Sequence, residues 1–232
     1  MRAGTIAVRR TLAGVYAVMA SLAGAGAWAG SITGSAHDFT GASWSGGQIC
    51  VACHTPHGGS TTVTDAPLWN HTVTTATYTL YTTTSTLNAG PLDQPSGVSK
   101  LCLSCHDGTV AVDSFGGATG GTLMTGPNAV GAAAQGSLAN DHPIGFVYNT
   151  ALATADGALY DPATRSVTIG AGGDKSRTGT VATQMLFNGR LECASCHDVH
   201  NTFTALNGTG LGSPLLRVSK GGSTICLTCH NK

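Results

Sequence analysis

The chain has 232 residues, of which 33 are glycine and 9% are charged, whereas an ordinary soluble domain has roughly 25% charged residues. Its 11 basic and 11 acidic side chains balance, which excludes the electrostatic surface that nucleic acid or an anionic membrane would require. The glycines have no period of three and 41% of the residues are hydrophobic, so a collagen and a charged disordered polymer are also excluded.

Residues 1–29 have the features of a secretory signal peptide. Arg2, Arg9 and Arg10 precede an uncharged run that ends at Ala29 in a small-x-small pattern, the order expected of an export signal. The run is rich in alanine and glycine and is a poor spanning helix, although an uncleaved anchor is the alternative. After cleavage, 8 basic and 11 acidic side chains remain, a net charge of −3. We expect an exported protein with no membrane span once the signal is removed.

All eight cysteines belong to one motif, Cys-x-x-Cys-His, which occurs four times. The copies are Cys50, Cys53 and His54; Cys102, Cys105 and His106; Cys193, Cys196 and His197; and Cys226, Cys229 and His230. This motif attaches c-type haem, because two thiols on one helical turn reach the vinyl groups and the next histidine faces the iron. The sequence therefore predicts four covalent haem c groups (Fe), with the motif histidines as proximal ligands.

Three other uses of cysteine fit less well. Eight cysteines in an exported protein could form four disulfides, and Cys-x-x-Cys pairs also occur in zinc ribbons and in thioredoxin-like redox motifs. Neither zinc nor a disulfide requires a histidine directly after every pair, and no cysteine is left over. Haem attachment is therefore the favoured interpretation.

An internal duplication assigns the distal ligands. Each half of the chain has an upstream histidine, then a Cys-x-x-Cys-His-x-x-His motif, then Val-Ser-Lys before a simple Cys-x-x-Cys-His. The matching positions are His37 and His57 in the first half and His142 and His200 in the second. His71 has no counterpart and is the spare. Met124 and Met185 are alternative ligands, but the histidines suffice for four irons.

Between the motifs the sequence predicts little regular structure. The tract 61–86 is rich in threonine and aromatic residues and could form an edge strand or an extended strap. The long gap 107–191 is a partly independent insert, with a turn at 140–143 and a turn leading into a short strand over 161–169. The predicted fold class is a multihaem cytochrome c, mostly coil with short helices at the haem motifs and a few short strands. Its core is dominated by haem, and two related dihaem halves cover about 30–135 and 136–232.

Two imidazoles on each iron leave no open coordination position, which favours electron transfer over catalysis. One segment that holds a proximal and a distal histidine three residues apart also places two haems close together. We therefore expect an electron-transfer protein rather than an enzyme.

The motif order resembles that of a known family. The segments that carry the resemblance are 36–38, 50–57, 66–70, 101–108, 141–144 and 193–200. They look like those of doubled-motif tetrahaem cytochromes, which are similar to the four-haem subunits that polymerise into extracellular cytochrome nanowires. The resemblance implies a fold with little secondary structure, bis-histidine ligation and alternating stacked and T-shaped haem pairs. It also implies that one axial histidine comes from the next subunit, by position His37.

Three functions follow as hypotheses. The first is a secreted or cell-surface filament subunit that binds itself head to tail and passes electrons from other cytochromes to extracellular acceptors, with His37 donated in trans. The second is a monomeric periplasmic shuttle with all ligands in cis. The third is a multihaem reductase with one open iron, for which the sequence offers no acid/base cluster. Two sequons, at Asn70 and Asn207, are weak signals.

Overall fold

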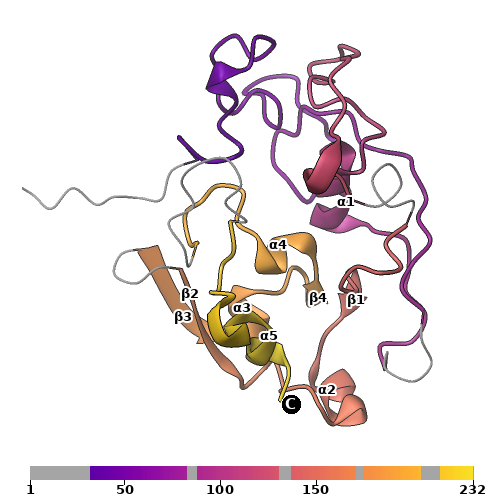
Figure 1. Ribbon diagram of the computed structural model, residues 1–232, viewed down its shortest axis with the longest axis vertical. Coiled ribbons are helices and arrows are strands. Elements are labelled where there is room, and N and C mark those ends of the chain that lie inside the picture. Colours follow the sequence, from indigo (N-terminus) through magenta and orange to yellow (C-terminus); the bar gives the residue numbers. More distant parts are fainter. Residues whose placement is uncertain (1–31, 83–87, 131–136, 171–174, 205–214, 232) are drawn as a thin grey trace, which may run out of the picture.

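The computed structural model describes residues 32–82, 88–130, 137–170, 175–204 and 215–231. The expected signal peptide and the second sequon lie outside the described residues. Most of the chain is coil and turn, with short elements (Figure 1). The helices are η1 (Phe39–Gly41), α1 (Gly97–His106), η2 (Gly126–Asn128), α2 (Thr150–Asp156), α3 (Val181–Gln184), α4 (Cys193–Cys196), η4 (Gly221–Ser223) and α5 (Thr224–Cys229). The strands are β1 (Phe146–Val147), β2 (Ser166–Gly170), β3 (Ser176–Thr180) and β4 (Arg190–Leu191).

Three of the four cysteine motifs are helical. Residues 102–106 end α1, the third motif forms α4, and the fourth lies in α5. The first motif is a turn instead, in which the backbone N–H groups of Cys53 and His54 both donate to the carbonyl of Cys50. All four thus bring two cysteines onto one turn of backbone.

The strands form two small antiparallel sheets, β1 with β4 and β2 with β3. The strand expected over 161–169 is β2, where Val167 and Ile169 are buried and Ser166 and Thr168 are exposed. This alternation is that of a strand with one covered face. The tract 61–86, as far as it is described, is an extended strap with isolated bridges at His71 and Leu80 rather than a strand.

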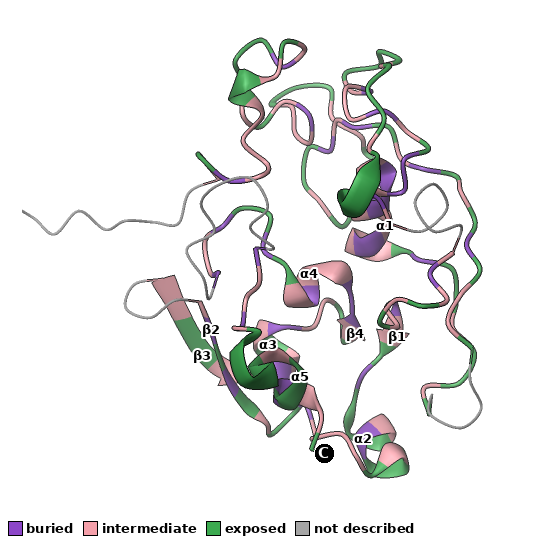
Figure 2. Cartoon of the chain, in the orientation of Figure 1, coloured by how far each residue is buried: buried purple, intermediate pink, exposed green. Residues whose placement is uncertain are grey.

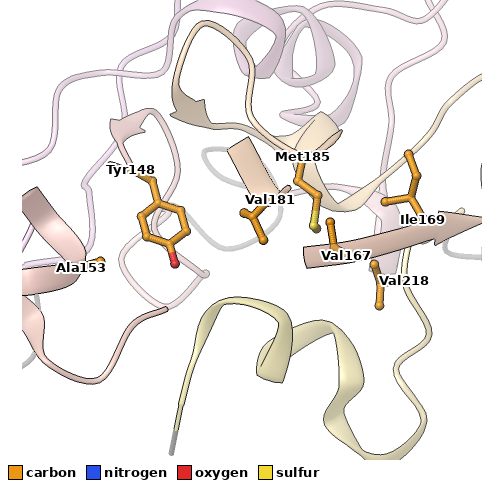
Figure 3. Close-up of a cluster of buried hydrophobic side chains, with 7 residues drawn as sticks. All are labelled: Tyr148, Ala153, Val167, Ile169, Val181, Met185 and Val218. Atoms are coloured by element: carbon orange, nitrogen blue, oxygen red, sulfur yellow. The ribbon is translucent and has the colours of Figure 1, made fainter. Parts of the chain in front are cut away.

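The aliphatic core is small. In the second half, seven buried residues gather around β2, α3 and the coil before α5 (Figure 3). They are Tyr148, Ala153, Val167, Ile169, Val181, Met185 and Val218. A second cluster joins Tyr78 of the strap and Leu103 of α1 to Leu138, just past the boundary between the halves. Elsewhere buried residues occur only in short, scattered stretches (Figure 2).

Local signals explain the helix ends. The Asn149 side chain accepts a hydrogen bond from the backbone of Leu152 at 2.9 Å and caps the start of α2. Gly157 ends the same helix in a left-handed conformation, at φ 71°. Thr180 and Thr183 form a reciprocal capping box at the start of α3.

The two halves meet at α1 and α4, which lie next to each other in the middle of the molecule (Figure 1). The Ser99 hydroxyl on α1 donates to the buried carboxylate of Glu192, the N-cap of α4, and accepts from the backbone N–H of Cys193 at 3.0 Å. The halves predicted from the duplication are therefore linked by buried polar contacts. Within the described part of the chain, no helix is long and apolar enough to cross a membrane.

Candidate haem-binding sites

The structure brings six of the eight predicted iron ligands together as three pairs of imidazole rings. His37 faces His106 with ring centres 6.1 Å apart. His54 faces His200 at 6.3 Å, and His142 faces His230 at 6.4 Å. Each pair joins one predicted proximal ligand to one predicted distal ligand. His57 and His197, both exposed, are the remaining two.

These separations leave room for one metal ion between the two imidazoles of each pair. A metal binds an imidazole nitrogen at about 2.0 Å, and the ring centre lies about 1.1 Å beyond that nitrogen, so opposite rings have centres about 6.2 Å apart. The three measured values lie between 6.1 and 6.4 Å. The angles between ring planes, 53°, 22° and 69°, differ from pair to pair. Two rings that share only a metal–nitrogen axis can rotate freely about it, so this variation is compatible with axial ligation.

Backbone carbonyls orient one ring of each pair. The Nδ1 atom of His54 lies 2.8 Å from the carbonyl of Pro67, that of His106 lies 2.7 Å from Asn128, and that of His142 lies 2.9 Å from Pro143. Metal-binding histidines are usually held in this way, because a donor bond from one ring nitrogen fixes the tautomer and leaves the other nitrogen for the metal.

The first motif is held by the segment after the loop 58–66. The backbone N–H of Thr55 donates to Leu68 at 3.0 Å, and that of Asn70 donates to Cys53 at 2.9 Å. The Asn70 side chain also donates to Val51 at 2.7 Å. These bonds place the Pro67 carbonyl against His54, so the coil replaces the helix that positions the other motifs.

Within one chain, His37 faces His106, and its expected donation to the next subunit, which involves a second chain, stays a prediction. The segment that carries it is folded back rather than extended: Asp38 caps η1, and Trp44 packs against Phe115 with ring centres 5.9 Å apart. Burial, followed by the charges of His106, His200 and His197, lowers the pKa of His37 to about 4. A neutral imidazole is the form that binds a metal. Its Nδ1 is buried and has no hydrogen-bond partner in the described part of the chain.

The other candidate ligands are engaged elsewhere. His71 is 4% exposed, and its two ring nitrogens lie 2.8 and 3.0 Å from the carbonyls of Thr72 and Ala111. Met185 is 1% exposed inside the core cluster of the second half. The Nε2 atom of His71 also lies 3.4 Å from the thiol of Cys105, so this histidine packs beside the second motif with both ring nitrogens engaged.

The cysteines are free and form one continuous series. Burial, then the charge of Cys50, raises the pKa of Cys53 to about 11, and burial, then the charge of Cys53, raises that of Cys105 to about 12. Across the halves, a hydrogen bond from the Cys102 thiol to Cys193 raises the pKa of Cys102. Neighbouring motifs are thus close enough to interact from the first to the fourth.

The exposed apolar side chains at the motifs suit an apolar group with a metal at its centre. Leu68 is 51% exposed next to the first motif, and Leu227 is 41% exposed inside the fourth. Val199, between His197 and His200, is also exposed. Covering such side chains would stabilise the protein by about 25 cal/mol for each Å² of apolar surface removed from water.

Among the residues placed by the structure, no three His, Cys, Asp or Glu side chains converge as a metal site. A haem iron needs only two protein ligands, because the porphyrin supplies the other four.

Two buried aspartates directly follow motif histidines. Asp107 follows His106, and Asp198 follows His197. Asp107 accepts hydrogen bonds from Thr74 and Tyr78, both at 2.7 Å. Burial raises the pKa of Asp107, but these bonds outweigh it and hold the net pKa below its ordinary value.

Asp198 organises the loop that carries His200. It accepts from the backbone N–H groups of His200 at 3.1 Å, Thr202 at 2.9 Å and Phe203 at 2.7 Å. The repeated Cys-His-Asp tripeptide was the available signal for both aspartates.

Comparison with known proteins finds no matching family model and no matching curated protein.

Proposed function

We propose that this protein transfers electrons through four covalently attached haem c groups, each held between two histidines. When bound, such a group supplies one reversible Fe(III)/Fe(II) couple. The observation that carries the proposal is the set of three histidine pairs with ring centres 6.1 to 6.4 Å apart, each made of one motif histidine and one distal candidate. If two histidines of the chain held each iron, no coordination position would remain for a substrate, so the proposal is electron transfer rather than catalysis.

The duplication assigns the fourth pair. In each half the upstream histidine faces the histidine of the second motif: His37 faces His106, and His142 faces His230. Across the halves, His200 of the third motif faces His54 of the first. The symmetric counterpart of that contact joins His57 to His197.

This assignment makes the two halves depend on each other. The segment 54–57 contributes to two irons, one with His200 and one with His197, and the segment 197–200 contributes to the same two. Each half therefore completes a ligand set of the other. The buried contact of Ser99 with Glu192 lies at the same boundary.

The cis contact of His37 favours a monomeric, exported electron carrier over a filament held by ligation in trans. A filament held by ligation in trans requires His37 to be free of its own chain, whereas here it lies beside His106 and Trp44 packs against Phe115. A filament formed through other surfaces, at the cell surface or outside the cell, is the second form of the same electron-transfer proposal.

The test begins with the protein matured in a bacterial host that attaches c-type haem. We expect a mass increase of four haems, a fully low-spin oxidised spectrum and no binding of carbon monoxide. A matched control, Cys226→Ala with Cys229→Ala, should carry three. Protein without haem would overturn the proposal, and a high-spin centre in the wild type would indicate a reductase.

His37→Met should alter the spectrum of the monomer, and electron microscopy of the wild type distinguishes monomer from filament.

A further inference from the structure

A cavity of about 380 Å³ opens beside His200, between the β2–β3 hairpin, α3 and the loop after α4. Its wall combines a histidine with charged and aromatic side chains. These lining residues are Arg177, Phe187, Asp198, His200, Phe203 and Arg217. A predicted axial ligand and two arginines therefore share one cavity.

The two arginines are held in place by neutral groups. The guanidinium of Arg177, on β3, lies over the ring of Phe203 at 4.4 Å from its centre. The Nε atom of Arg217 donates to the carbonyl of Ala194 at 2.8 Å, and its guanidinium lies 5.9 Å from the centre of the Phe187 ring. Both side chains are thus oriented by uncharged groups.

Neither arginine forms an ion pair in the described part of the chain, where the one pair joins Arg190 to Glu192 at 3.8 Å. Asp198 is the carboxylate nearest at hand, but its two oxygens accept the backbone N–H groups of the loop that carries His200. Burial lowers the pKa of Arg217, and the charge of Asp198 acts in the opposite direction. A further carboxylate in the cavity would offset the cost of burying this guanidinium.

We propose that Arg177 and Arg217 bind the propionate carboxylates of the haem that His54 and His200 would hold. The inference rests on the proposed function. A guanidinium presents parallel N–H donors that match a carboxylate, and such charge-assisted bonds are stronger where water is partly excluded. A c-type haem carries two propionates, and the cavity beside its axial ligand offers two cations. The arginines would fix how that haem is rotated about its axis and would raise its reduction potential.

The source of the carboxylate is open to direct test, because a free small anion could enter the same cavity. The experiment uses the matured protein and compares Arg177→Gln, Arg217→Gln and Arg217→Lys with Lys175→Gln. Lys175 lies two residues from Arg177 and does not line the cavity, so its variant controls for the loss of one positive charge nearby. Each protein is checked for four haems and then titrated by spectroelectrochemistry.

In each glutamine variant, we expect one of the four midpoint potentials to become more negative. The pH range over which that potential changes should lie at higher pH than in the wild type. The physical reason is that a propionate without its arginine is easier to protonate and no longer has its charge balanced. Arg217→Lys should show a smaller shift, because it keeps the charge and loses the paired donors.

Unchanged potentials in proteins that carry four haems, or shifts no larger than that of Lys175→Gln, would overturn the inference while leaving the proposed function intact. Acetate added to the wild type distinguishes the two sources. If acetate shifts the potential in the wild type but not in Arg177→Gln, the cavity takes a free anion and the propionate assignment is wrong. Arg177 is exposed, so its variant is expected to fold. Absence of haem from every protein would instead refute the proposed function.

Discussion

The replacement His200→Ala tests the contact on which the site assignment depends most. His200 is in the second half of the chain, yet its ring lies 6.3 Å from His54 in the first motif. The variant should therefore open one axial position at the haem of Cys50 and Cys53. One iron in four changes, so we expect about a quarter of the low-spin signal to become high-spin. One carbon monoxide should bind per protein.

A second variant identifies which haem is affected. In a protein that lacks the first haem through Cys50→Ala and Cys53→Ala, the His200→Ala change should create no new high-spin iron, because the two changes act on one site. The measurements are electron paramagnetic resonance and carbon monoxide titration of the oxidised and reduced proteins. Any carbon monoxide site in the combined variant, or an unchanged spectrum in His200→Ala alone, would refute the pairing of His54 with His200.

Three further predictions concern stability. Replacing all eight cysteines by alanine should abolish cooperative unfolding in calorimetry, because the aliphatic clusters are too small to replace four haems; a sharp transition would contradict this. Leu103→Ala should destabilise the matured protein by about 3 kcal/mol in denaturant titrations, since Leu103 is 1% exposed. The control Leu123→Ala, at 51% exposure, should change stability by less than about 0.5 kcal/mol. Burial raises the pKa of Glu192 above 4.5, so folding holds a proton there that the unfolded chain releases. Stability should fall as pH rises from 4.5 to that raised pKa, and Glu192→Gln should remove this slope; equal slopes in both proteins would disprove it.

The spacing of cysteines and histidines along the sequence was sufficient to predict the four attachment motifs and the eight ligand candidates. A Cys-x-x-Cys-His motif acts within one turn of backbone, so its chemistry can be read without the fold. The strand at β2 was also predictable, because the alternation of Val167 and Ile169 with polar residues is a local pattern. The first motif could not be recognised as a turn, since the bonds that hold it come from residues 67–70.

What the sequence determined by itself was the position of the four motifs, from which haem attachment is predicted, and the number of histidines available. Which histidine faces which was decided by the tertiary structure. More than half of the chain separates His54 from His200. Their contact depends on α1 lying next to α4, which no local pattern in the sequence can indicate. Similarly, His37 was assigned a role from its position in the sequence alone, and the tertiary structure shows that within one chain it lies beside His106. The buried aspartates after His106 and His197 likewise gain their roles only from N–H and O–H groups that folding brings to them.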